Sequence, residues 1–212
     1  MDKQLYLHGI YTAGELYNSK DTLKILRKIL ISNALLSNRL QGIEEKKISF
    51  SGLDYISLCD YEKKDICLGY NYNAYQIFIK NSLSLMFPKD KLSVIIPQTI
   101  DIPRDKEYTK KVIAYGISEP VRYTDLPDEV QVRDKISLDL LIGLSLPLSK
   151  MQRYFYSKKR TFYMVEKELE QIKELLQAYN YNVPLYDIDT LELLEEPTTV
   201  KRLVNYYYKN RD

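Results

Sequence analysis

Three short stretches carry side chains suited to binding and cleaving a polar ligand. The first is Leu7-His8-Gly9, which ends an alternating stretch over residues 4–8 that predicts a short strand. An imidazole at a strand edge can exchange a hydrogen bond with a sugar hydroxyl, and the adjacent glycine lets a ligand approach the backbone. An ordinary polar residue at a strand end is the alternative, and the spacing alone favours it.

The second stretch is Gly52-Leu53-Asp54-Tyr55-Ile56-Ser57-Leu58, which predicts a turn entering a strand. A tyrosine on a strand beside a cleft can stack its ring on a flat aromatic ligand. The chain holds 20 tyrosines, so a core or surface tyrosine is the simpler interpretation of Tyr55.

The third stretch is Pro127-Asp128-Glu129-Val130-Gln131-Val132-Arg133. Side chains alternate across a strand, so the two valines share one face and Glu129, Gln131 and Arg133 share the other. If the valines face the core, Glu129 projects from the first residue of the strand. A solvated charged face is the common alternative for such a pattern.

The elements that must position these residues are short. Apolar spacing predicts helices over residues 21–36 and 163–179, and an extended piece begins at Asn182. Strand-like runs separated by polar turns cover residues 75–79, 83–87, 92–96, 112–115, 129–133 and 140–146. This pattern predicts an antiparallel-rich α+β fold. The chain has no Gly-x-Gly-x-x-Gly after a strand and no Walker-type lysine, which disfavours Rossmann and P-loop nucleotide sites.

Composition sets outer limits on function. The 212 residues fit one large domain or two very small ones, and the net charge of +2 gives no global attraction to nucleic acid or anionic lipid. Cys59 and Cys67 lack a second cysteine or histidine cluster, so we expect no zinc site and a reducing, cytosolic location. No run approaches the roughly 20 apolar residues of a membrane span, and the apolar N-terminal stretch is too short for a signal peptide.

Taken together and in this order, the motifs resemble a known family. A His-Gly ends the first strand, Leu35-Leu36-Ser37-Asn38-Arg39 follows a helix, a tyrosine sits in a glycine-led strand, and a glutamate opens a late strand. The chain is similar here to the His-Tyr-Glu branch of the ADP-ribosyltransferase-like superfamily, over about residues 5–148 and best over 128–147. The resemblance implies a split, antiparallel-rich β-sheet core with flanking helices: a catalytic domain over 1–150 and a helical C-terminal extension over 151–212.

The resemblance also implies a reaction and its residues. NAD⁺ would lie in a cleft between two small sheets, where Glu129 would stabilise the positive charge that develops on the ribose. His8 would bond the adenosine-side ribose, the Gly9 backbone would lie near the nicotinamide amide, and Tyr55 would stack on the nicotinamide. Arg39 would meet a phosphate or help to deprotonate the acceptor. No metal is implied.

The acceptor stays open between a protein side chain and a nucleic acid. Many arginine- or asparagine-directed members carry Glu or Gln two residues before the catalytic glutamate, and Pro127 stands there instead. Small members of the superfamily are often toxins, effectors or phage-conflict proteins, which act in the cytoplasm or in the cytosol of a target cell. An antitoxin or immunity protein is the further partner that such a role implies, and no membrane partner is expected.

Three other interpretations stay open. An RNA 2′-phosphotransferase would need a paired Arg-His pattern, which the sequence lacks. A catalytically dead member could bind a partner. A nucleic-acid-binding module could use Lys158-Lys159-Arg160 and the tail Tyr206–Arg211, which mix cations with aromatic rings. A solvated helix end and a frayed terminus are the simpler interpretations of those two stretches.

Overall fold

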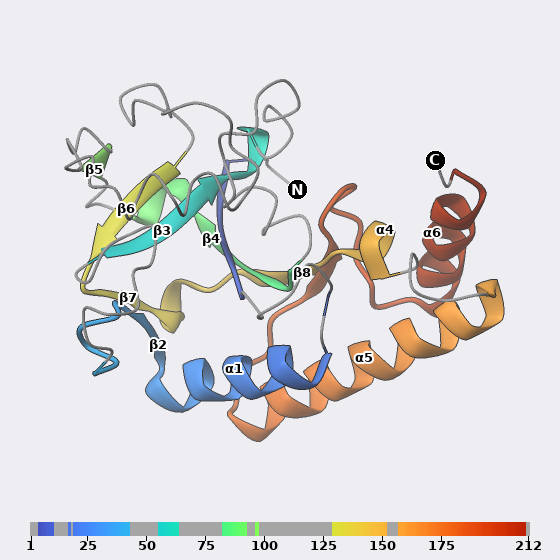
Figure 1. The fold of residues 1–212 in the computed structure, drawn as a ribbon, viewed down its shortest axis with the longest axis horizontal. Helices are drawn as coiled ribbons and strands as arrows, with labels where there is room; N and C mark the ends of the chain where they lie inside the picture. Colours follow the sequence, from blue (N-terminus) through green and yellow to red (C-terminus); the bar gives the residue numbers. More distant parts are fainter. Residues whose placement is uncertain are drawn as a thin grey trace, which may run out of the picture.

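The structure is a computed structural model that describes residues 4–10, 17, 19–42, 55–63, 82–92, 96–97, 129–151 and 157–210. Figure 1 shows a twisted sheet with two long helices running beneath it and a third helix at one end. The strands expected at 75–79 and 112–115 lie outside the described residues, as does most of the one expected at 92–96.

The main sheet has seven strands in the order β5-β6-β3-β1-β4-β8-β9. Their bounds are β1 Leu5–Gly9, β3 Tyr55–Asp60, β4 Ser84–Pro88, β5 Ile96–Pro97, β6 Glu129–Arg133, β8 Gly143–Leu146 and β9 Leu185–Asp187. Every neighbouring pair is antiparallel except β8 and β9, which are parallel. The predicted antiparallel-rich α+β fold is confirmed.

A second sheet pairs β2 (Ala34–Leu36) with β7 (Lys135–Ser137). The helix expected over residues 21–36 is wrong at its C-terminal end, because α1 spans Ser19–Ser32 and gives way to β2. Asn33 adopts a φ of 51°, a left-handed conformation that Asn tolerates better than most residues and that commonly ends helices. The chain then leaves the helix axis and pairs with β7.

The remaining helices are α4 (Leu148–Met151), α5 (Lys158–Ala178) and α6 (Pro197–Lys209), and short 3₁₀ turns occupy Tyr61–Lys63, Lys89–Lys91 and Leu138–Leu140. The helix expected from residue 163 begins five residues earlier. Ser157 caps it, because its side-chain oxygen accepts a hydrogen bond of 3.2 Å from the Arg160 backbone N–H.

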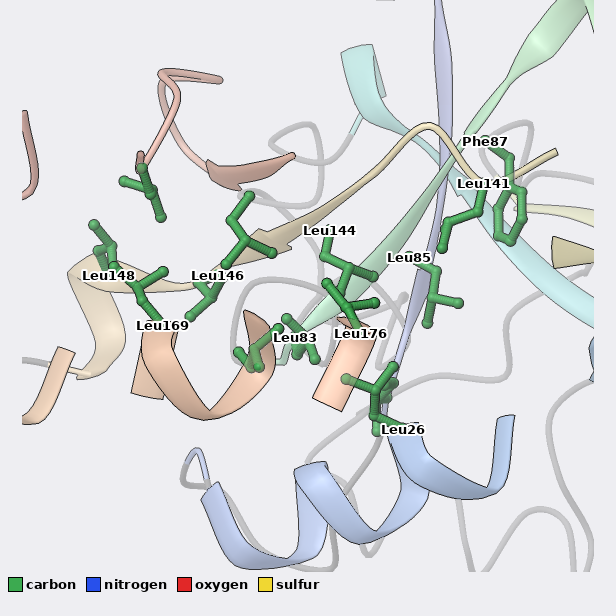
Figure 2. Packing of buried hydrophobic residues seen from close by; sticks show 14 of the residues in the cluster. Leu26, Leu83, Leu85, Phe87, Leu141, Leu144, Leu146, Leu148, Leu169 and Leu176 are labelled. Atoms are coloured by element: carbon green, nitrogen blue, oxygen red, sulfur yellow. The ribbon is translucent and has the colours of Figure 1, made fainter. Parts of the chain in front are cut away.

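Most of the core lies between the sheet and the helices (Figure 2). Alternation along the central strands divides the buried residues between the two faces of the sheet. Tyr6, Leu85 and Phe87 belong to the cluster that α1 and α5 cover. Leu7 and Met86 belong to a second, smaller cluster, which also contains Leu5, Cys59, Tyr61, Tyr186 and Ile188. The strands are therefore buried on both faces over the middle of the sheet.

The last quarter of the chain supplies parts of both the sheet and the core. Strand β9 pairs with β8 through Ser145 and Tyr186, and α5 places Val165, Leu169, Ile172 and Leu176 in the main cluster. Helix α4 crosses the proposed boundary at residue 150, and the division into two segments stays a prediction. The tail interpreted as a frayed terminus is instead largely the end of α6, whose Val204 and Tyr207 are buried.

Candidate active site

The three strands that hold the candidate catalytic residues are neighbours in the main sheet. His8 lies on β1, Tyr55 on β3 and Glu129 on β6, in the spatial order β6-β3-β1. The register pairs Leu7 with Cys59 and Cys59 with Glu129. Three motifs that are far apart in the sequence thus fall on one continuous antiparallel ladder.

His8 makes a specific contact with the neighbouring strand. Its Nδ1 lies 2.9 Å from the backbone carbonyl oxygen of Ser57, to which it donates a hydrogen bond. Burial lowers the pKa of the ring, and the bond to the carbonyl opposes that effect only in part. The ring is therefore neutral at pH 7. With the proton on Nδ1, Nε2 carries the lone pair and can accept a hydrogen bond from a hydroxyl.

Glu129 and Tyr55 are placed by their backbones, and their side chains lie outside the described part of the structure. Glu129 opens β6 opposite Cys59, two strand spacings, or roughly 10 Å, from β1. Tyr55 pairs with Arg133 at the other end of the same ladder, about 13 Å further along the strand. The ladder brings residues 8 and 129 into adjacent rows and sets Tyr55 apart from both.

Side chains along a strand alternate between the two faces of the sheet, which limits which of these residues can share a face. Leu7 shares a row with Glu129, whereas His8 occupies the next position along β1. Tyr6 and Ile10, which alternation places on the same face of the sheet as His8, belong to the main cluster that α1 and α5 cover. The roles of His8, Tyr55 and Glu129 in one site stay predictions.

Gly9 and Arg39 were the other proposed ligand-binding residues. Gly9 ends β1 opposite Ser84 of β4 and is buried. Arg39 is exposed in the turn after β2, where its carbonyl accepts a hydrogen bond of 3.0 Å from the Gly42 N–H. The backbone N–H of Ser37 donates to the Asp134 carbonyl at 2.8 Å, so this turn is tied to the end of β6.

An ion pair near the Glu129 end of the ladder was missed from the sequence. Lys89 Nζ lies 2.7 Å from Asp60 Oδ2, and both side chains are about five-sixths buried. The same ammonium lies 5.6 Å from the centre of the Tyr6 ring, within the range of a cation–π contact. The sequence offers no signal for this pairing, because lysines and acids are numerous and the partners are 29 residues apart.

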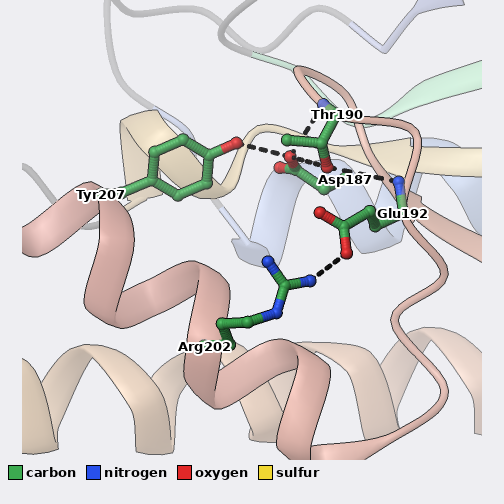
Figure 3. A network of polar contacts seen from close by, with 5 residues as sticks. All are labelled: Asp187, Thr190, Glu192, Arg202 and Tyr207. Atoms are coloured by element: carbon green, nitrogen blue, oxygen red, sulfur yellow. Dashed lines mark hydrogen bonds and ion pairs between the residues drawn. The ribbon is translucent and has the colours of Figure 1, made fainter.

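A buried carboxylate at the opposite edge of the sheet was also missed. Asp187 of β9 is fully buried, and its Oδ2 accepts hydrogen bonds from the Tyr207 hydroxyl at 2.5 Å and the Thr190 hydroxyl at 2.8 Å (Figure 3). The pKa of Asp187 is raised to about 6: burial is the main cause, the hydrogen bonds from Tyr207 and Thr190 oppose the rise, and the nearby Asp189 adds to it. The spacing Asp187-x-x-Thr190 is the one local signal, since it predicts an Asx-type turn.

Two kinds of feature are absent from the described residues. No group of three or more histidines, cysteines, aspartates or glutamates in that part of the chain could hold a metal ion. Of the helices described, none combines the length and the apolar character that crossing a bilayer requires.

The fold and the ladder together define a class: an α+β protein in which a mostly antiparallel sheet carries a histidine, a tyrosine and a glutamate on adjacent central strands. No known protein family matches the chain, and no curated protein sequence matches it.

Solved structures of Thermus sp. 2.9 DarT, a bacterial ADP-ribosyltransferase, are similar to this protein. The complex with carba-NAD⁺ matches 87% of this chain and 95% of that chain, with a TM-score of 0.45 and 12% identity. The complex with ADP-ribosylated single-stranded DNA matches 81% and 90%, with a TM-score of 0.38 and 14% identity. A likeness at this level concerns the course of the chain and does not extend to the side chains of a site.

Proposed function

We propose that this protein is an NAD⁺-dependent mono-ADP-ribosyltransferase that transfers ADP-ribose to a macromolecular acceptor. The observation that carries the proposal is that β1, β3 and β6, which hold His8, Tyr55 and Glu129, lie side by side in the main sheet, although His8 and Glu129 are 121 residues apart in sequence. The motifs that resemble the superfamily are therefore on neighbouring strands, and strand alternation assigns positions 8 and 129 to opposite faces of the sheet.

The proposed reaction breaks the bond between the nicotinamide nitrogen and C1′ of its ribose. Nicotinamide leaves as a neutral molecule, the acceptor's nucleophilic atom bonds to C1′, and the acceptor loses its proton. Positive charge develops on the ribose in the transition state, where a carboxylate beside the 2′-hydroxyl is most effective. Glu129 has this role in the proposal.

The state of His8 fits the binding part of the proposal. A neutral ring that donates from Nδ1 to Ser57 has its lone pair on Nε2, which is the form that a hydrogen bond from a ribose hydroxyl requires. Gly9 and Tyr55 are assigned to the nicotinamide, and Arg39 to a phosphate, by the sequence resemblance. The register sets Tyr55 far along β3, so of these residues its assignment has the least support.

The acceptor is proposed as a protein side chain or a nucleic acid. The ligands of the structurally similar DarT, which are NAD⁺, carba-NAD⁺ and ADP-ribosylated single-stranded DNA, suggest the reactants to try first. A role as a toxin, effector or phage-conflict protein, acting in the cytoplasm or in a target cell and countered by an antitoxin or immunity protein, belongs to the same proposal.

The test is incubation with NAD⁺ labelled in the adenine ring, in the presence of single-stranded DNA, RNA or a cell protein extract. Nicotinamide release and label transfer are measured separately. Replacing Glu129 with Gln keeps the shape and removes the charge, so we expect a loss of about 2–4 kcal/mol in transition-state stabilisation, or roughly 30- to 1,000-fold in rate. Glu166→Gln, on the exposed side of α5, is the matched control and should leave the rate unchanged.

Two results would contradict the proposal. If no acceptor fraction gains label and no nicotinamide is released, the protein is not an ADP-ribosyltransferase. If Glu129→Gln reacts as fast as the wild type, the reaction exists but Glu129 does not stabilise its transition state.

A further inference from the structure

Helix α6 exposes a polar and aromatic face at the edge of the molecule. Its buried side consists of Val200, Leu203, Val204 and Tyr207. The opposite side lines a shallow hollow of about 470 Å³ formed by Thr198, Lys201, Arg202, Asn205, Tyr206 and Lys209. These residues recur at spacings of three and four, so they form one continuous strip along the helix, which we term the α6 face.

The charge of the α6 face is positive over its last three turns. Within the described part of the chain, Lys201 and Lys209 take part in no ion pair, whereas Arg202 pairs with Glu192. The two lysines are eight residues apart, which corresponds to about 12 Å along the helix axis. Two ammonium groups at this separation can contact two phosphates of the same strand.

Tyr206 adds an aromatic platform between the two lysines. Its side chain is 56% exposed, and its ring meets the Tyr207 ring edge-on at 5.3 Å and 69°. The Tyr207 hydroxyl is in turn bonded to the buried Asp187 carboxylate at 2.5 Å. The exposed ring is thus braced against a side chain that is anchored in the protein, which reduces the entropy lost when a flat ligand stacks on it.

We propose that the α6 face binds a single strand of nucleic acid, with Lys201 and Lys209 on phosphates and a base stacked on Tyr206. Cations along a groove together with an exposed ring are the features that bind single strands without sequence preference. An anionic membrane would instead require several exposed apolar side chains, and Tyr206 is the one large hydrophobic residue exposed in this hollow.

The α6 face lies far from the ladder of the proposed active site. Five strand spacings, about 24 Å, separate β6 from β9, and α6 is attached at the β9 end of the sheet (Figure 1). The inference does not rest on NAD⁺ chemistry, so binding can be tested without NAD⁺. Nucleic-acid binding by the α6 face and ADP-ribosyl transfer can therefore be confirmed or contradicted independently.

Fluorescence anisotropy with a labelled thymidine oligonucleotide of about 12 nucleotides, a length in the range that single-strand sites cover, tests this directly. The dissociation constant is measured at several salt concentrations. Each lost phosphate contact reduces the slope of log affinity against log salt by about 0.7, so Lys201→Ala combined with Lys209→Ala should reduce it by about 1.4. Tyr206→Ala should weaken binding about tenfold and leave the slope unchanged, whereas Tyr206→Phe should bind like the wild type.

Lys167→Ala combined with Lys173→Ala is the matched control. These two lysines lie on α5 among Glu166, Glu170 and Glu174, so removing them changes the net charge equally without touching the α6 face. The control should keep the wild-type affinity and slope. Circular dichroism checks that every variant is folded.

Four results would overturn the inference. The first is that the wild-type protein does not bind the oligonucleotide. The second is that the α6 lysine pair and the α5 control pair change the slope equally. The third is that duplex of the same length binds as tightly as the single strand, and the fourth is that Tyr206→Ala binds like the wild type.

Discussion

The protonation state of Asp187 governs part of the stability of this protein. The carboxylate is fully buried, accepts hydrogen bonds from two hydroxyl groups and has no cation within reach among the described residues. One of its oxygens, Oδ1, has no hydrogen-bond partner in the same part of the chain. Such a group favours the neutral form, which is why its pKa rises to about 6.

The first prediction is a pH dependence with a defined sign. The folded pKa of Asp187 lies above its unfolded value of 3.8, so the folded state binds the extra proton and the stabilisation is complete below about pH 4. It is lost as the pH rises to about 6. The difference of about two pKa units corresponds to about 3 kcal/mol. Over that window Asp187→Asn, which cannot titrate, should gain this amount relative to the wild type in urea unfolding.

The exposed Asp90→Asn is the control for this prediction, and its difference from the wild type should stay constant over the same window. A constant difference for Asp187→Asn as well would show that the buried carboxyl group titrates equally in the folded and unfolded states.

At the scale of elements, the contact between β8 and β9 depends on a glycine. A Cβ atom added at Gly143 would lie 2.7 Å from Cε2 of Tyr186 and 3.1 Å from the Pro184 carbonyl oxygen. The Tyr186 ring is itself buried, so it has little room to move away. We predict that Gly143→Ala lowers the free energy of unfolding by about 1–3 kcal/mol, the usual cost of overpacking. Urea denaturation measures the change.

Ser145→Ala, two residues further along β8, is the matched control. The Ser145 hydroxyl is buried and has no hydrogen-bond partner among the described residues, so its loss should change stability little. Equal stability of Gly143→Ala and the wild type would mean that the parallel strand pair tolerates a wider spacing.

The sequence predicted some elements well because their signal is local. Strand β6 has the predicted bounds, because valines that alternate with polar residues over 129–133 are typical of a strand with one face buried. Strands β2 and β7 have only three residues each, too few for periodicity to detect. The first turn of α5 was missed because Lys158-Lys159-Arg160 contains no apolar residue, although the Ser157 cap was available as a signal.

The candidate site was likewise predictable from the sequence only where its signal is local. His8, Tyr55 and Glu129 could be chosen from residue types and order, because the order of motifs along the chain can be read from the sequence alone. That His8 bonds to Ser57, and that Leu7 instead of His8 shares a row with Glu129, depend on pairing between distant strands. Asp187 was missed because an isolated aspartate near a turn resembles a solvated loop residue until α6 packs over it.

At the scale of the whole molecule, the two proposed segments share one core. Helix α5 contributes Val165, Leu169, Ile172 and Leu176 to the same cluster as Leu26 of α1. We therefore predict that a chain ending at Met151 does not fold cooperatively, because the sheet face that α1 and α5 cover loses α5. Thermal unfolding followed by circular dichroism should show no transition, whereas a chain ending at Asn210 should unfold like the full-length protein. A sharp transition for the shorter chain would establish residues 1–151 as an autonomous domain.

The position of β9 at the edge of the sheet has a consequence for biosynthesis. Leu185 of β9 pairs with Leu144 of β8, 41 positions earlier in the chain, so β8 presents an unpaired outer edge until the ribosome has made β9. An open strand edge is a template for pairing with other chains. Completion of the sheet therefore waits until α5 and β9 have been made, and the interval before it is when the nascent chain most needs a chaperone.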